Sequence, residues 1–344
     1  MKKKVVNAME VARLAGVSQS TVSRVFSPST AVSEKTRHRV WKAAEELGYR
    51  PNALARGLIM NKTKIIGLII RDIQNLCYPE ILDKFIKGLR AKGYHVLLAH
   101  TENNEVNQDE VYQFLEYNVD GIIVIDTLLS LNTLAHLSKY NIPIILFNQY
   151  TEASSCSYHF VGCDNYAAGK DIGEYLLKQG HHQYACITGH RNGFMSHECE
   201  KGFRQVFQQR GIKTAIEAGD GTYEGGYKAA MRLLKGGSPP DAIFCASDLM
   251  ALGAADAARS LNLSIPEHVS IVGFNDSVMA SLHPYSLTTW RQPFDELIAI
   301  TIKTLLDDID GRIKSPVSIL LCGVLIKRDS VRASHNTDGA LNSE

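Results

Sequence analysis

The arrangement of hydrophobic and polar residues changes character near residue 65. Before that point, apolar residues recur every three or four positions, which is the spacing of one face of a helix. After it, short uninterrupted apolar runs alternate with segments of helix length. Because buried parallel strands have such continuous runs, the pattern predicts a small helical domain followed by a larger α/β domain.

The stretch 9–26, MEVARLAGVSQSTVSRVF, is predicted to form two short helices joined at Gly16. Asn7 and Glu10 have the spacing of a capping box, in which each side chain accepts a hydrogen bond from the other residue's backbone N–H. Gly16 can take the left-handed backbone that ends the first helix, and Ser18 can cap the second. The apolar positions expected to face inward are Val11, Ala12, Ala15, Val17, Val22 and Val25.

This pattern leaves a polar outer surface on the second helix, as in a helix-turn-helix whose second helix enters a DNA major groove. For these residues alone, an ordinary helical hairpin with a polar surface is the alternative. A third helix over 34–47, capped by Ser33 and ended by Gly48, completes a small core. Residues 52–58, after Pro51, can form a further short helix that has no core of its own.

Charge is distributed unevenly along the chain and favours the DNA-binding interpretation. Residues 1–62 hold twelve lysines and arginines against four acidic residues, a net charge of +8. Since the whole chain carries +1, residues 63–344 carry −7. A basic head on an acidic body is expected when one end of a protein neutralises phosphates.

The rest of the chain is predicted to form two doubly wound lobes. The first series of apolar runs covers 65–70, 96–99, 121–125 and 143–147, separated by helices at 80–92, 106–117 and 130–140. The second series covers 159–163, 184–188, 242–246 and 269–274, with helices near 165–179, 197–210, 224–236 and 248–262. Such folds bind ligands at the C-terminal ends of their strands, so a cleft between the lobes is the predicted pocket.

Composition is that of a globular protein, with 45% hydrophobic and 21% charged residues. No apolar run approaches the length of a membrane span, and the basic N-terminus leads into polar helix, so we expect a cytoplasmic protein with no membrane partner. The seven cysteines are scattered and form no CxxC pair. They are interpreted as free thiols, mostly buried, and neither a metal nor a cofactor is expected.

Residues 9–58 resemble the DNA-binding head and hinge of the LacI/GalR family of bacterial transcription regulators. The segments that carry the resemblance are EVARLAGVSQSTVSRVF, VSEKTRHRVWKAAEELGYRPN and LARGL, followed by DGIIV, VGCDNYAAG, FCASDLMALGA, IPEHVSIVGFND and LTTWRQP. The resemblance implies a helix-turn-helix domain at 1–50, a hinge helix and linker at 51–63, and a two-lobed effector-binding and dimerisation domain at 64–332. A polar tail at 333–344 is predicted to be disordered.

The resemblance assigns DNA contacts to particular residues. Gln19, Ser20 and Arg24 occupy the base-reading positions, and glutamine and arginine can bond adenine and guanine through paired hydrogen bonds. Thr21 and Ser23 are predicted to hold phosphates. The hinge residues expected in the minor groove are Asn52, Ala53, Arg56 and Leu58. Because two such leucines would wedge one DNA centre, we expect a homodimer on near-palindromic operator DNA.

The family fold implies that the chain crosses between the lobes more than once. Residues 65–160 and 292–320 would form the N-terminal lobe, and 161–290 and 321–332 the C-terminal lobe. The expected effector is a small polar metabolite, such as a sugar or sugar derivative. The candidate effector-binding residues are Arg71, Asp72, Cys77, Tyr78, Asn148, Asp164, His197, Cys199, Ser247 and Asn275. Asp248 is interpreted as a helix N-cap.

Three positions depart from the family pattern. Sugar- and purine-binding relatives usually have an arginine at the position of Cys199, an aspartate at that of Asn275 and an aromatic residue at that of Gly221. A cysteine cannot supply the planar five-donor fork of an arginine. Either the ligand is unusual, with donors from other residues, or the pocket has lost its usual ligand.

Two other classes of function are weighed against DNA-dependent regulation. An enzyme with an accessory DNA-binding head has little support, because the chain contains neither HExxH nor a P-loop. A small-molecule-binding protein that never engages DNA conflicts with the basic head. The sequence therefore predicts a sequence-specific transcription regulator of a carbohydrate or related metabolite operon, and the family resemblance favours a repressor.

Overall fold

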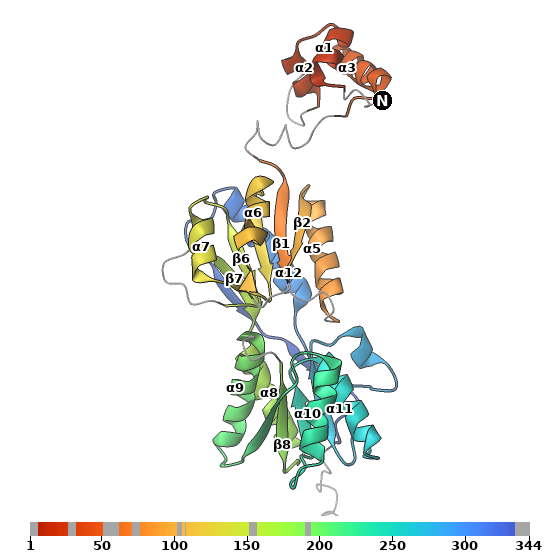
Figure 1. The fold of residues 1–344 in the computed structure, drawn as a ribbon, viewed down its shortest axis with the longest axis vertical. Helices are drawn as coiled ribbons and strands as arrows, with labels where there is room; N and C mark the ends of the chain where they lie inside the picture. The colour runs from red at the N-terminus through yellow and green to blue at the C-terminus, as the bar shows by residue number, and fades with distance from the viewer. Residues whose placement is uncertain are drawn as a thin grey trace, which may run out of the picture. The chain divides into compact units, whose positions relative to one another are not determined.

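The computed structural model describes residues 6–26, 32–50, 62–70, 76–101, 105–106, 108–150, 157–189 and 194–333. The chain divides into two compact units, Met1–Lys64 and Ile65–Glu344. The first unit is helical and the second is α/β, as the hydrophobic pattern predicts (Figure 1).

The first unit contains α1 (Ala8–Ala15), α2 (Gln19–Val25) and α3 (Glu34–Leu47) around one small core. The predicted capping box is confirmed: Asn7 Oδ1 accepts from the backbone N–H of Glu10, and the Glu10 carboxylate accepts from the backbone N–H of Asn7, both at 3.1 Å. Gly16 ends α1 in the left-handed conformation, at φ 63°. The buried residues of this core are Val11, Ala12, Ala15, Val22, Val25, Val40, Ala43 and Ala44.

The second unit contains two six-stranded sheets, each covered by helices on both faces (Figure 1). In the first lobe the strand order is β13-β7-β6-β4-β1-β2, and all neighbours are parallel. Its strands are β1 (Ile65–Ile70), β2 (His95–His100), β4 (Gly121–Ile125), β6 (Ile144–Phe147), β7 (His159–Cys163) and β13 (Ser318–Leu321). Its helices are α5 (Tyr78–Ala91), α6 (Gln108–Glu116), α7 (Leu131–Ser138) and α12 (Phe294–Ile309). The short strands β3 (Glu105–Val106) and β5 (Leu128–Leu129) pair separately.

In the second lobe the strand order is β14-β12-β11-β10-β8-β9, and only β14 among the described strands of this sheet runs antiparallel to its neighbour. Its strands are β8 (Tyr184–Thr188), β9 (Thr214–Ala218), β10 (Ala242–Cys245), β11 (Ser270–Phe274), β12 (Thr288–Arg291) and β14 (Val324–Ile326). Its helices are α8 (Asn165–Lys178), α9 (Phe194–Gln208), α10 (Tyr223–Leu234), α11 (Asp248–Ser260) and the 3-10 helix η1 (Val278–Ser281). Helices α8 and α9 share one core with the sheet, and α10 and α11 share the other.

Glycines allow α8 and α9 to touch through their backbones. A Cβ atom added to Gly169 would lie 2.0 Å from the carbonyl oxygen of Cys199, and one added to Gly202 would lie 2.0 Å from that of Tyr166. A side chain at either position would therefore push the two helices apart.

The predicted lobe boundary at residue 160 is wrong, because it cuts through β7. All of β7 lies in the first sheet, where it pairs with β6 and with β13. The chain passes to the second sheet after β7, returns after β12 and leaves again after β13. The edge strand β9, the crossover strand β12 and the helix α12 were not predicted as elements.

Candidate functional site: the α2 surface and the lobe junction

Helix α2 presents the predicted DNA-reading residues on its solvent face. Ser18 caps the helix by accepting from the backbone N–H of Thr21 at 3.2 Å, which fixes the first turn. Gln19 and Ser20 lie exposed in that turn, and Arg24 lies exposed near the other end. The opposite face is held in the core through Val22 and Val25.

The two predicted phosphate contacts differ in their surroundings. Ser23 is exposed on α2, whereas Thr21 is half-buried and its hydroxyl lies 2.9 Å from Ser18 Oγ. The predicted hinge contacts Asn52, Ala53, Arg56 and Leu58 lie outside the described residues. Their DNA roles stay predictions.

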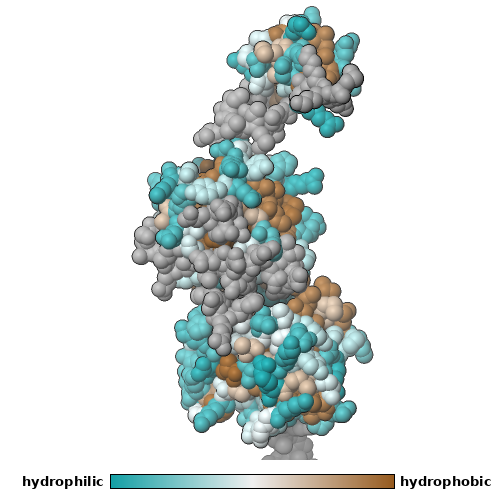
Figure 2. Space-filling model, viewed as in Figure 1, coloured by the Kyte–Doolittle hydropathy of each residue, from teal (hydrophilic) through white to brown (hydrophobic). Residues whose placement is uncertain are grey.

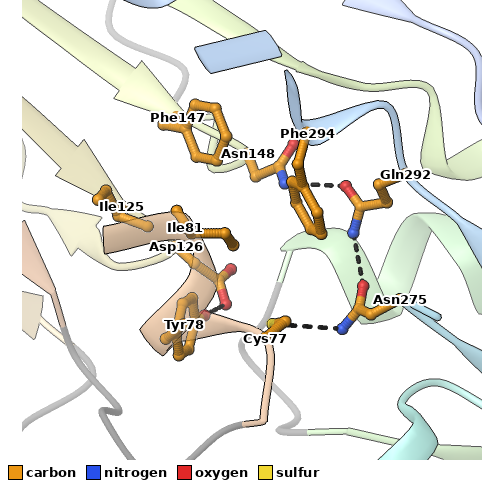
Figure 3. A pocket seen from close by; sticks show the side chains of 10 residues that line it. All are labelled: Cys77, Tyr78, Ile81, Ile125, Asp126, Phe147, Asn148, Asn275, Gln292 and Phe294. Carbon is orange, nitrogen blue, oxygen red and sulfur yellow. Dashed lines mark hydrogen bonds between the residues drawn. The ribbon is translucent and has the colours of Figure 1, made fainter. Parts of the chain in front are cut away.

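A small cavity of about 10 Å³ lies where the two lobes meet, with room for about one water molecule. Figure 3 shows that its walls come from both lobes and from the crossover that leads into α12. The residues that line it are Cys77, Tyr78, Ile81, Ile125, Asp126, Phe147, Asn148, Asn275, Gln292 and Phe294. Aromatic and aliphatic side chains with a few placed polar groups are typical of small-molecule sites.

Buried amides form a chain of hydrogen bonds through this junction (Figure 3). The backbone N–H of Cys163 donates to Asn148 Oδ1 at 2.9 Å, and Asn148 Nδ2 donates to Gln292 Oε1 at 2.9 Å. Gln292 Nε2 then donates to Asn275 Oδ1 at 2.7 Å, and Asn275 Nδ2 lies 3.7 Å from Cys77 Sγ. The chain therefore runs from the first lobe to the second and back.

Burial and nearby carboxylates determine the ionisation of Cys77 at the junction. Tyr78 donates its hydroxyl proton to Asp126 on the first-lobe side. Burial, together with the negative charges of Asp126 and Asp248, raises the pKa of the Cys77 thiol well above its usual range. Cys77 is thus a neutral thiol at physiological pH.

Asp248 is buried below the second-lobe side of the junction. Its Oδ1 accepts from the Thr289 hydroxyl at 2.6 Å, and its Oδ2 accepts from the backbone N–H of Ser277 at 2.5 Å. Burial raises the pKa of this carboxyl to about 7, although the two hydrogen bonds oppose the shift. The prediction that Asp248 is an N-cap is wrong: Ser247 caps α11, and Asp248 is the first helical residue.

The structure brings four of the predicted effector-binding residues together, namely Cys77, Tyr78, Asn148 and Asn275. Four others do not line the cavity, and two of these serve as helix caps: Asp164 accepts from Ala167 N, and Ser247 accepts from Met250 N. His197 is exposed on α9, and Cys199 is only 1% exposed, in the core against α8. Arg71 and Asp72 lie outside the described residues.

Sequence reasoning missed several residues of the cavity, above all Asp126, Gln292 and Phe294. Asp126 directly follows the predicted strand 121–125. The rule that such folds bind ligands at the C-terminal ends of their strands, here called the strand-end rule, therefore also applies to Asp126. Gln292 and Phe294 belong to a crossover whose place in the fold depends on pairing between distant strands.

The described part of the chain contains six thiols and no group of side chains that could hold a metal ion. Cys77, Cys163, Cys186, Cys199 and Cys245 are buried thiols, and Cys322 is an exposed thiol. Among the described residues, no three His, Cys, Asp or Glu side chains are placed to hold a metal ion. No helix in the described segments is both long and apolar enough to cross a membrane.

A small helix-turn-helix unit combined with a two-lobed α/β unit that has a polar junction defines a class of ligand-responsive regulators. Comparison with known proteins agrees: the model for bacterial regulatory proteins of the lacI family matches residues 4–52, and that for a periplasmic binding protein-like domain matches 174–331. The HTH-type transcriptional repressor PurR of Escherichia coli O139:H28 (strain E24377A / ETEC) is 34% identical over 327 residues, covering 94% of this chain and 96% of that protein. The chain therefore belongs to the lacI family of bacterial regulatory proteins.

Solved structures extend this similarity to the fold. The Lac repressor dimer bound to operator and the anti-inducer ONPF superposes with a TM-score of 0.85 at 27% identity, over 96% of this chain and 100% of that one. A complex of the transcriptional regulator CelR with cellobiose gives a TM-score of 0.72 at 28% identity, over 94% and 99% of the two chains.

Proposed function

We propose that this protein is a transcriptional repressor that binds a near-palindromic operator as a homodimer and is controlled by a small polar effector at the lobe junction. The observation that carries the proposal is the capped helix α2, which exposes Gln19, Ser20 and Arg24 while its other face is held in the core. Such a helix can read base edges in a major groove. The relatives named as repressors favour repression over activation.

The lobe junction is the proposed effector site. Its aromatic residues Tyr78, Phe147 and Phe294 can contact C–H groups, and its amides can pair with hydroxyl groups. The cavity has room for about one water molecule, so the lobes would have to move apart to admit an effector. A sugar or sugar derivative fits the chemistry of the lining, and cellobiose is bound by the structural relative CelR. The effector would bias the lobes toward one arrangement, and its effect on DNA affinity is limited by its differential affinity for the two arrangements. We propose binding without turnover, in the cytoplasm where operator DNA is found.

The proposed dimer face lies on the side of the second unit that carries exposed apolar residues of both lobes. Figure 2 shows hydrophobic surface where α5 and β2 lie and again around η1. The exposed residues there are Ile86 and Leu98 in the first lobe and Val278, Met279 and Leu282 in the second. Exposed apolar surface repeated along one face is typical of an interface.

An ordered polar cluster lies beside η1 and supports the same face. Asp256 accepts hydrogen bonds from the hydroxyls of Tyr223 at 2.7 Å and Tyr285 at 3.0 Å, and from Arg259 at 2.7 Å. The Arg259 guanidinium also lies over the Tyr285 ring, 5.0 Å from its centroid. Tyrosine and arginine held in fixed positions are the residues that dominate protein interfaces. A second copy of this chain is the proposed partner.

Effector control can be tested with a thermal-shift screen of sugars, sugar acids, polyols and nucleosides. A ligand at 100 times its dissociation constant is expected to stabilise the protein by about 2.7 kcal/mol. The Asn275→Ala variant should lose that stabilisation, because Asn275 lines the cavity. A compound that stabilises the protein and leaves its operator affinity unchanged would contradict effector control.

The dimer face can be tested by sedimentation velocity. Val278 is 74% exposed on the proposed face, whereas Leu320 is 54% exposed on β13, the sheet edge opposite to β2. Val278→Lys is expected to give monomers because it places charges at a two-fold interface, and Leu320→Lys should remain dimeric. Dimers of both variants would exclude this face.

A further inference from the structure

Gln292 occupies a special place in the second unit. It follows the last residue of β12, directly before the chain returns to the first lobe at α12. Its side chain is 3% exposed, and its amide contacts one residue of each lobe. Its carbonyl oxygen accepts from Asn148 at 2.9 Å, and its nitrogen donates to Asn275 at 2.7 Å.

Separation of the lobes would break one of these two bonds, because Gln292 can stay with only one of its partners. Asn148 and Asn275 are both buried and both have left-handed backbone, at φ 57° and 104°, so the local chain holds their amides in place. Asn148 is held further by the backbone N–H of Cys163. A buried amide that loses its partner carries a desolvation penalty unless another group replaces the bond.

We propose that Gln292 is the positioning residue that couples the two lobes: its amide keeps them together, and an effector that enters the cavity must take over its bond to Asn148 or its bond to Asn275. The regulatory meaning of this coupling rests on the proposed function. The coupling itself is a property of the second unit and can be measured without DNA or effector.

The chain contains a matched control for Gln292. Gln149 is equally buried, at 3% exposure, but its amide donates to the carbonyl oxygen of the next residue, Tyr150, at 3.3 Å and stays within the first lobe. Replacement of either glutamine by methionine keeps an unbranched side chain of similar size and removes the amide. Only the Gln292 variant should change the relation of the lobes.

The chain also contains a reporter beside the coupling residue. Of its two tryptophans, Trp41 lies in the helical unit, and Trp290 lies two residues before Gln292 at 3% exposure. Trp290 packs against the segment between β13 and β14, where the chain passes from the first lobe to the second for the last time. A Cβ added to Gly323 in this segment would lie 2.4 Å from Trp290 Nε1. In a Trp41→Phe background, tryptophan fluorescence therefore reports on the lobe junction alone.

The experiment compares acrylamide quenching of Trp290 in Gln292→Met, Gln149→Met and their parent. Loss of one neutral buried hydrogen bond is expected to raise the ratio of open to closed lobes by roughly fivefold, and quenching should rise only in Gln292→Met. Equal quenching in Gln292→Met and the parent, or an equal rise in Gln149→Met, would overturn the proposal.

A second variant, Gln292→Asn, tests the same coupling in case Gln292→Met does not fold. Gln292→Asn retains an amide but is one methylene shorter, so it cannot contact both partners and should also raise quenching. If neither Gln292 variant folds while Gln149→Met does, Gln292 has a structural role and the coupling proposal is wrong. Neither the quenching results nor the folding results test DNA binding, which is measured separately on operator DNA.

Discussion

The buried carboxyl of Asp248 makes the stability of the second unit depend on pH. Burial raises the pKa of Asp248 from 3.8 to about 7, so the folded protein keeps this proton to near neutrality while the unfolded chain releases it near pH 4. Between these values the folded state binds more protons than the unfolded state. Stability therefore falls as pH rises through this window, and the loss is complete above pH 7.

The size of the effect follows from the proton difference. One proton corresponds to about 1.4 kcal/mol per pH unit, so this group should lower the free energy of unfolding by about 2 kcal/mol between pH 5 and pH 7. Solvent does not screen this electrostatic contribution to stability, because Asp248 is only 1% exposed. The protonated carboxyl can donate to Thr289 Oγ1, so its hydrogen bond to that side chain can be retained.

The matched variant is Asp248→Asn, which keeps the shape of the side chain and cannot titrate. Urea unfolding of both proteins across this pH range should show a stability difference that changes by about 2 kcal/mol, whatever its absolute value. Comparison of the two proteins cancels the titration of all other groups that the substitution leaves undisturbed. Parallel pH curves would contradict a raised pKa of Asp248, because they would mean that its carboxyl is already ionised at pH 5 in the folded protein.

Three further predictions concern DNA recognition and packing. Gln19→Ala and Arg24→Ala should each reduce base discrimination by roughly 1–3 kcal/mol in binding assays on single-base operator variants, and equal losses on every sequence would contradict direct readout. Leu58→Ala should lower specific affinity and DNA bending, measured by circular-permutation electrophoresis, and an unchanged bend would exclude a wedge role. Gly169→Ala should lower the free energy of unfolding by about 1–3 kcal/mol, since its Cβ would meet the Cys199 carbonyl oxygen. Gly237→Ala should have little effect, because the space around Gly237 is open. Equal effects of the two substitutions in urea unfolding would show that α8 and α9 are not in close contact.

Features set by neighbouring residues could be predicted from the sequence. The capping box of α1, the left-handed Gly16 and the Ser33 cap of α3 follow from side chains within three residues of the affected backbone groups. The continuous apolar runs of the central strands were equally visible, because these strands are buried on both faces.

Features set by distant pairing could not be predicted. Strand β7 lies between β6 and β13, and β13 lies more than a hundred residues further along the chain, so the apolar run of β7 alone does not indicate which sheet it joins. The edge strand β9 was missed because it is largely exposed and has no continuous apolar run. Gln292 was missed for a related reason, since its partners come from two different strand ends.

The candidate site shows how capping and packing compete with ligand binding for the same residue types. Asp164 and Ser247 follow strands, as ligand contacts do, but their side chains cap the next helices. Cys199 lies in the core, with its carbonyl oxygen against Gly169. Cys77, Tyr78, Asn148 and Asn275 do come together, so the strand-end rule found the lobe junction even though it could not separate lining residues from caps.

Repression of a specific operon requires that the helical unit read a particular DNA sequence. The most direct measurement is selection of bound duplexes from a random pool by the full-length protein, followed by sequencing. Repressor function predicts enrichment of one near-symmetric sequence with two half-sites. Equal recovery of all duplexes, with no enriched sequence after repeated rounds, would contradict it.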